Sequence, residues 1–173
     1  MKNTNKIGLI GFLLILVTLA VSSFTIPKNE KVKEIELKDF WYSWDDAMKK
    51  AQKENKMILV DAYTTWCGWC TKMEKDTYAK DSIQKLINAN FVPVKINPEV
   101  TNVTYKIGSK SYTGRELLAF LASGKSYNSY PMTYFWLDPS KETDGKRKYL
   151  QSGYQNPANM SLLLRRVIEI KGN

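Results

Sequence analysis

Two cysteines, Cys67 and Cys70, lie between a predicted strand and a predicted helix, separated only by Gly68-Trp69. Residues 57–63 begin with four consecutive apolar residues, which is typical of a short strand buried on both faces. Residues 71–77 are mostly good helix formers and contain no helix breaker. This order predicts that Cys67 begins a helix and that Cys70 lies on the same helical face one turn later.

That position favours redox chemistry. At the start of a helix, free backbone N–H groups and the positive end of the helix dipole stabilise a thiolate, which is the form of cysteine that attacks disulfides. Cys70 is then placed to attack Cys67 and release a partner held there in a mixed disulfide. We expect Gly68 to let the turn pass without a Cβ atom, and Trp69 to place an aromatic surface beside the sulfurs.

A zinc site and a structural disulfide are the two alternatives to redox chemistry for this cysteine pair. Half of a zinc site would need carboxylates as its remaining ligands, because the chain has only two cysteines and no histidine. A structural disulfide would stabilise the fold little, because it closes so small a loop. The sequence therefore predicts a redox-active dithiol with no metal and no organic cofactor.

The N-terminus has the pattern of a secretory signal. Lys2 and Lys6 precede the almost wholly apolar residues 7–21, and Ser22-Ser23 follow as small residues near a cleavage point. We predict a signal peptide over residues 1–23, with an uncleaved N-terminal membrane anchor as the alternative, although a spanning helix needs about 20 apolar residues. Either way the protein would act outside the cytoplasm, where disulfides persist.

The rest of the chain is long enough for one domain. We predict a linker over residues 24–40 and a single domain over residues 41–173. The formal net charge is +9, but the lysines are scattered and no nucleic-acid-binding motif accompanies them, which indicates a solvated surface and no nucleic-acid partner.

Further helices and strands are predicted from periodicity and capping residues. Pro93 indicates that the strand around it is not fully hydrogen-bonded on both sides. Helices are expected over residues 43–54, 83–89, 113–123 and 157–170, strands over 91–96, 132–137 and 146–154, and a hairpin over 104–112.

Residues 41–170 resemble the thioredoxin superfamily in their order of elements and in the motif Trp66-Cys67-Gly68-Trp69-Cys70. Within this superfamily, the sequence most resembles the thioredoxin-like domains of the bacterial envelope that exchange electrons with other envelope proteins. The resemblance implies an α/β thioredoxin-like fold, with a central mixed β-sheet flanked by helices and an insertion at residues 97–130 before the cis-proline strand.

The resemblance also implies roles for two charged residues. Asp61 stands where thioredoxins have a buried acid that helps to move the proton of the inner cysteine, here Cys70; the alternative is a carboxylate that only caps the end of a strand. Lys95 stands where thioredoxins keep a lysine near that acid, as a proton-transfer partner; an ordinary solvent-facing lysine is the alternative.

A substrate-binding surface is implied beside the cysteines. Tyr130-Pro131 stands where thioredoxins have a cis-proline packed against the dithiol, which exposes the backbone at Tyr130 for pairing with an extended substrate segment. Trp66 and Trp69 are expected to add aromatic surface for the substrate. Gly153-Tyr154 matches a position that brings a small residue near the site.

The sequence departs from its relatives between the cysteines, where it has Gly-Trp and no histidine, and this argues against a strong oxidant. We therefore predict a thiol:disulfide oxidoreductase, acting as reductant or isomerase on disulfides of extracytoplasmic proteins, with an upstream electron donor or acceptor protein, in a bacterial periplasm. The alternative is a redox-inactive peptide-binding or chaperone module of the same fold. The sequons that begin at Asn102 and Asn159 keep a eukaryotic secretory origin open.

Overall fold

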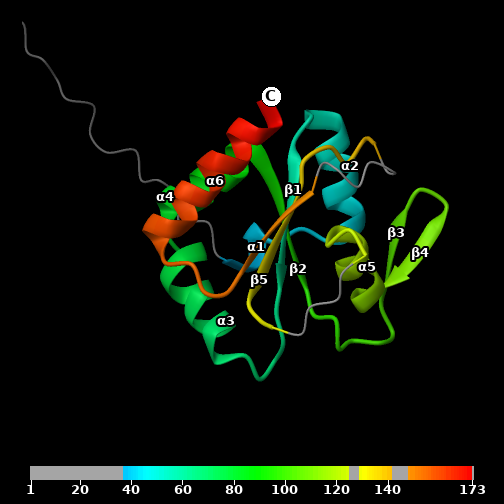
Figure 1. The fold of residues 1–173 in the computed structure, drawn as a ribbon, viewed down its shortest axis with the longest axis horizontal. Helices are drawn as coiled ribbons and strands as arrows, with labels where there is room; N and C mark the ends of the chain where they lie inside the picture. The colour runs from blue at the N-terminus through cyan, green and yellow to red at the C-terminus, as the bar shows by residue number, and fades with distance from the viewer. Residues whose placement is uncertain (1–36, 125–128, 142–147, 173) are drawn as a thin grey trace, which may run out of the picture. The chain divides into compact units, whose positions relative to one another are not determined.

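A four-stranded mixed sheet carries the fold (Figure 1). Its strands lie in the order β2 (Phe91–Ile96), β1 (Met57–Ala62), β5 (Met132–Trp136) and β6 (Lys148–Ser152). β1 pairs in parallel with β2 and antiparallel with β5, which pairs antiparallel with β6. The computed structural model describes residues 37–124, 129–141 and 148–172. The predicted signal peptide and most of the predicted linker lie outside these residues.

β1 is the centre of the molecule, because all six of its residues are buried. Side chains alternate between the two faces of a strand. Ile58 and Val60 therefore contribute to the core on one face, and Met57 and Leu59 to the core on the other. By the same alternation Asp61 faces the side of Met57 and Leu59, and this places a carboxyl group under the helices on that face.

Helices cover both faces of the sheet (Figure 1). One face packs against α2 (Trp44–Glu54) and α5 (Gly114–Leu121). The other face packs against five helical segments, which are α1 (Leu37–Phe40), α3 (Gly68–Met73), η1 (Glu74–Tyr78), α4 (Asp81–Asn90) and α6 (Pro157–Gly172). The predicted α/β fold with a central mixed sheet between helices is confirmed.

Local capping explains where the helices begin. Ser43 Oγ accepts the N–H of Asp46 at 3.2 Å, and Thr113 forms a reciprocal capping box with Glu116. At the start of α6, Asn156 Oδ1 accepts the N–H of Asn159 at 2.9 Å. The helices predicted over residues 43–54, 113–123 and 157–170 are thereby confirmed at their N-terminal ends.

The prediction for the strand around Pro93 and the predicted hairpin are also confirmed. β2 lies at the edge of the sheet, where the Pro93 carbonyl accepts the N–H of Tyr42 at 2.9 Å from outside the strand. The hairpin consists of β3 (Thr104–Ile107) and β4 (Lys110–Thr113), which form a separate two-stranded sheet within the insertion at residues 97–130.

Two predictions need correction. The linker predicted over residues 24–40 ends too late, because α1 is helical and Phe40 packs in the core with 1% of its surface exposed. The helix predicted from Cys67 begins there, as expected, but it is not a uniform α-helix, because α3 passes at Glu74 into the π-helical turn η1. Among the described residues no helix is long and apolar enough to cross a membrane.

Candidate redox site

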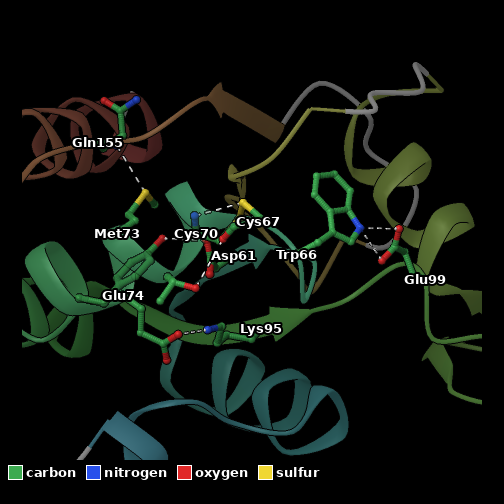
Figure 2. Close-up of a disulfide and its surroundings, with 11 residues drawn as sticks. Asp61, Trp66, Cys67, Cys70, Met73, Glu74, Lys95, Glu99 and Gln155 are labelled. Atoms are coloured by element: carbon green, nitrogen blue, oxygen red, sulfur yellow. Dashed lines mark hydrogen bonds and ion pairs between the residues drawn. A yellow bond between two sulfur atoms is a disulfide. The ribbon is translucent and has the colours of Figure 1, made fainter.

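The two cysteines form a disulfide at the start of α3 (Figure 2). Cys67 is the N-cap residue of this helix, so its side chain meets free backbone N–H groups. The N–H of Cys70 donates to the Sγ of Cys67 at 3.1 Å. A hydrogen bond of this kind stabilises a sulfur that carries negative charge, and this supports Cys67 as the more readily ionised thiol.

The disulfide is almost enclosed. Cys67 and Cys70 are 5% and 6% exposed, so only the edge of the sulfur pair reaches solvent. The turn before α3 is closed by the N–H of Cys67, which donates to the Thr64 carbonyl at 3.2 Å. Gly68 does not need to be a glycine, contrary to expectation, because an added Cβ there would meet no heavy atom within 4 Å.

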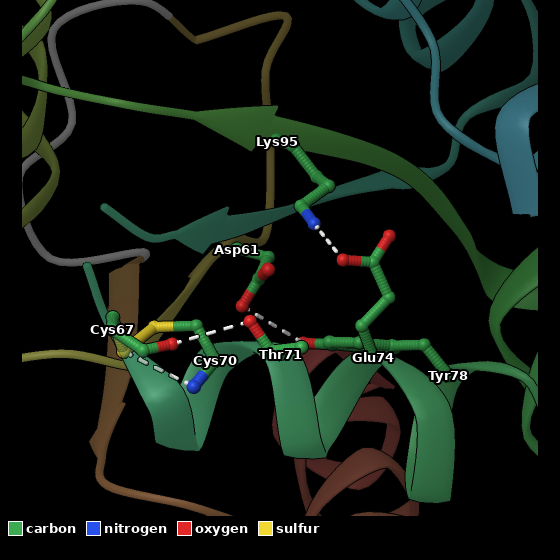
Figure 3. Close-up of polar contacts among 7 residues, drawn as sticks. All are labelled: Asp61, Cys67, Cys70, Thr71, Glu74, Tyr78 and Lys95. Atoms are coloured by element: carbon green, nitrogen blue, oxygen red, sulfur yellow. Dashed lines mark hydrogen bonds and ion pairs between the residues drawn. A yellow bond between two sulfur atoms is a disulfide. The ribbon is translucent and has the colours of Figure 1, made fainter. Parts of the chain in front are cut away.

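Asp61 is buried beneath this disulfide, as predicted. It is 3% exposed, and in both close-ups its side chain points from β1 toward the helix of the cysteines (Figure 3). Burial raises the pKa of Asp61 to about 7; the positive charge of Lys95 opposes this rise, and the negative charge of Glu74 adds to it. A carboxyl group with this pKa exchanges a proton near neutral pH, which is the property that a proton acceptor for Cys70 needs.

Lys95 is not an ordinary solvent-facing lysine. Its side chain is 17% exposed, and its Nζ lies 2.6 Å from a carboxylate oxygen of Glu74. The same ammonium group lies 4.5 Å from the ring centre of Tyr63 and 5.4 Å from that of Trp41. Lys95 is directly opposite Asp61 in the pairing of β1 and β2, so its charge acts on that acid while its ion pair is with Glu74.

The sequence patterns did not predict Glu74 and Tyr78, which η1 brings to this acid. In η1 the N–H of Ala79 donates to the Glu74 carbonyl, five residues back, at 3.0 Å. The buried Tyr78 hydroxyl donates to Oδ1 of Asp61 at 3.4 Å. No sequence signal predicted the π-helical turn. The sequence also offered no reason to connect Tyr78 with Asp61, because an aromatic residue at position 78 is explained equally well by packing in the core.

The solvent side of the disulfide is aromatic. Trp66 and Trp69 flank the motif and are 67% and 58% exposed. The Trp66 indole N–H donates to both carboxylate oxygens of Glu99 at 3.1 Å, and its ring contacts Tyr130 edge-on at 6.1 Å between centres. The structure therefore brings two of the predicted substrate-binding side chains, Trp66 and Tyr130, together with Glu99 of the insertion on one side of the site.

Pro131 lies beside this surface. The Tyr130–Pro131 peptide bond is cis, and Pro131 is buried. The Pro131 carbonyl accepts the N–H of Gly153 at 2.9 Å, and Gly153 has a φ of +84°, which favours glycine. Tyr154 follows and packs against Trp69 with 5.4 Å between ring centres. The roles that the resemblance implies for these residues stay predictions.

The described residues contain no group of three or more cysteine, aspartate or glutamate side chains that could hold a metal ion.

The chain is similar to known proteins over most of its length. A family model named Thioredox_DsbH, described as "Protein of unknown function, DUF255", matches residues 35–156. Spermatogenesis-associated protein 20 of Rattus norvegicus is 33% identical over 101 residues, which are 58% of this chain and 12% of that protein. The chain thus spans only a small part of the length of such relatives.

Solved structures show the same fold. A thioredoxin from Thermus thermophilus superposes with a TM-score of 0.56 at 19% identity, over 76% of this chain and 88% of that one. A structure described as DsbH oxidoreductase superposes with a TM-score of 0.53 at 15% identity, over 75% and 84% of the two chains. The family match covers more than half of the sequence, so this chain, which has a thioredoxin-like fold, belongs to the Thioredox_DsbH (DUF255) family.

Proposed function

We propose that this protein is a thiol:disulfide oxidoreductase that acts on protein disulfides through Cys67 and Cys70. The observation that carries the proposal is the placement of Cys67 at a helix start, with Cys70 one turn away and a buried carboxyl group of pKa about 7 beneath them. The fold shared with the thioredoxin and DsbH structures supports it.

The reaction transfers two electrons from the dithiol to the substrate. The Cys67 thiolate attacks one sulfur of the substrate disulfide, which forms a mixed disulfide and releases the other substrate sulfur as a thiolate. Cys70 gives its proton to Asp61, and the resulting Cys70 thiolate attacks the Sγ of Cys67. This step forms the Cys67–Cys70 disulfide and releases the second substrate thiolate. A protein dithiol upstream must then reduce the disulfide again.

The direction we propose is reduction or isomerisation. A strong oxidant needs a reduced form that is stabilised, for example by a positive charge beside the thiolate. Here the residues between the cysteines include no histidine, and the side chain of Asp61 is a buried acid that points toward the cysteine helix, where its negative charge disfavours a thiolate. Both features favour the oxidised, disulfide form of the protein over its dithiol form, so the dithiol should donate its electrons to substrates.

We also propose an extracytoplasmic location, in a bacterial periplasm, with substrates among the proteins exported there. The support is the pattern of Lys2, Lys6, residues 7–21 and Ser22-Ser23. Cysteine pairs that cycle between thiol and disulfide in such a compartment need a partner protein that supplies electrons.

Trp66 and Trp69 favour a second candidate, because exposed indole rings also suit a module that binds unfolded peptides without redox chemistry. Insulin reduction separates the two functions. The wild type should reduce insulin with dithiothreitol as donor, and a Cys67→Ser/Cys70→Ser variant should not. Equal suppression of aggregation by both proteins, without insulin reduction by the wild type, would favour the binding module.

Trapping tests which cysteine attacks. Cys70→Ser should accumulate mixed disulfides with partner proteins, whereas Cys67→Ser should accumulate few. Equal trapping by the two variants would contradict the assignment. Equilibration with glutathione would test direction, because a potential of about -270 mV is typical of a thioredoxin-like reductant and about -120 mV of a strong oxidant.

A further inference from the structure

The hydroxyl group of Tyr78 is not required by the packing of its ring. The ring of Tyr78 packs in the core against Trp41 and Phe40, with 4.9 Å and 6.5 Å between ring centres. A phenylalanine ring would make the same contacts. The hydroxyl, by contrast, costs free energy to bury unless it finds a hydrogen-bond partner. It lies beside two buried polar side chains, which are Asp61, to which it donates at 3.4 Å, and Thr133.

The π-helical turn orients this pair. Within η1, Glu74 turns to Lys95 on β2 and Tyr78 turns to Asp61 on β1 (Figure 3). Single π-helical turns inside α-helices are rare and occur frequently at functional sites. This one lies in the segment that continues from the cysteine helix, so it connects the acid to the element that carries the disulfide.

We propose that Tyr78 is a positioning residue for Asp61. Its hydroxyl group holds the ionised Asp61 carboxylate through a hydrogen bond to Oδ1, and this leaves Oδ2 to take the proton of Cys70. Among the described residues no other hydrogen bond to this carboxyl group is formed. The inference rests on the proposed function, because it assumes that Asp61 accepts that proton.

The charged and titratable groups around Asp61 come from three elements. Lys95 on β2 favours the ionised carboxylate, and Glu74 on η1 opposes it. Tyr78 on η1 donates to the carboxylate, and Cys70 on α3 is the proposed proton donor. Burial has the largest effect and raises the pKa of Asp61, whereas the hydrogen bond from Tyr78 lowers it. Without the hydroxyl, Asp61 should be protonated to a higher pH and should be a poorer base at neutral pH.

Tyr78→Phe tests this role, and Tyr154→Phe is its matched control. The Tyr154 hydroxyl also donates to an η1 carboxylate at 3.4 Å, but this partner is Asp76 at the surface. Carboxyl carbon NMR of the oxidised protein would follow Asp61 directly. We expect Tyr78→Phe to raise its titration midpoint by about 0.5–1 pH unit, and Tyr154→Phe to leave it unchanged.

The reaction gives a second measurement. The rate of single-turnover reduction of a peptide disulfide by the reduced protein should fall as the pH is lowered and Asp61 becomes protonated. In Tyr78→Phe, but not in Tyr154→Phe, this fall should occur at a pH that is higher by the same amount. A purely structural role would lower stability without moving this profile. An unmoved Asp61 midpoint in Tyr78→Phe would overturn the proposal.

The two measurements separate the inference from the proposed function. A shifted Asp61 midpoint with an unshifted rate profile would overturn the positioning role in the reaction, while wild-type reduction of the peptide would leave the dithiol function standing. Should Tyr78→Phe fail to fold, incorporation of fluorotyrosine into the wild type gives the opposite test. Its more acidic phenol is a stronger donor, so the Asp61 midpoint should fall; an unchanged or raised midpoint would again overturn the proposal.

Discussion

The two sides of the disulfide are built from different chemistry. The inner side holds a buried acid, a buried tyrosine and an ion pair, in Asp61, Tyr78, Lys95 and Glu74. The outer side holds aromatic rings that face solvent, chiefly those of Trp66 and Trp69. Proton transfer and partner contact are therefore served by separate sets of residues, and substitutions on the two sides should have different kinetic signatures.

Each side also carries a cost that the fold alone does not require. A buried carboxyl group is destabilising when it is ionised, because burial removes it from water. Two large exposed indole rings add apolar surface where a polar side chain would serve the fold equally well. These costs lie within a few residues of the same two sulfurs, and this coincidence supports a shared function.

The largest effect is expected from Asp61→Asn. The pKa of Asp61 is raised from 3.8 to about 7, so the folded state binds this proton more tightly than the unfolded state does. Its destabilising contribution is therefore absent below about pH 4, grows as the pH rises and is complete above the folded pKa. Asp61→Asn should stabilise the protein by about 2–4 kcal/mol at pH 8 and by much less at pH 4.5.

Urea unfolding at the two pH values would measure this difference, and insulin reduction would measure the cost to activity. We expect at least a roughly tenfold loss of turnover at neutral pH, because Cys70 loses its proton acceptor. A gain in stability that does not depend on pH, or unchanged turnover, would show that Asp61 is not a titrating base.

Lys95 and Glu74 should shift the titration of Asp61 in opposite directions. Lys95→Met removes the charge that favours the ionised acid, so the pKa of Asp61 should rise. Glu74→Gln removes an opposing charge and frees Lys95 from its ion pair, so the pKa should fall. Shifts of about one pH unit are expected, measured by carboxyl NMR. Shifts of the same sign in both variants would contradict this account of the inner side.

Trp66→Ala and Trp69→Ala address the outer side. Each should raise the KM for a protein substrate by about tenfold, through lost contact area, and should leave the pH profile unchanged. Leu162→Ala is the control, since Leu162 is 69% exposed on α6 and should not change KM. A shifted pH profile in a tryptophan variant would show that the two sides are coupled.

Sequence patterns were sufficient for the outer side and for most of the fold. The strand that begins at Met57 was predicted from its apolar run, and Trp66 and Trp69 from their position beside the cysteines. These features depend on neighbours in the chain. The burial of Asp61 was implied by the resemblance to thioredoxins, whereas the apolar run alone left open a carboxylate that only caps the end of the strand.

The remainder of the inner side depends on contacts between distant segments. Tyr78 reaches Asp61 only because η1 has one π-helical turn, and Glu74 captures Lys95 across 21 positions of sequence. Neither a π-helical turn nor such an ion pair has a pattern of its own along the chain. The end of the predicted linker was placed too late for a similar reason. Phe40 is helical and packs on a core that is built from residues later in the chain.

Gly68 provides the smallest and most local test of the comparison. It lies on the exposed side of the site, and neither its backbone angles nor its neighbours require glycine, because an added Cβ meets nothing within 4 Å and its φ is not positive. Gly68→Ala should therefore stabilise the protein by about 0.4–1 kcal/mol, since alanine restricts the unfolded chain more than glycine does.

Gly114→Ala is the control for Gly68→Ala, because a Cβ at Gly114 would come within 2.9 Å of the Pro98 Cα atom. This variant should lose stability, by about 1–3 kcal/mol, as expected for overpacking. Urea unfolding of both variants at one pH would compare them directly. A loss of stability in Gly68→Ala would mean that the outer side constrains the backbone of the motif as tightly as the inner side does. The two sides would then differ only in the chemistry of their side chains.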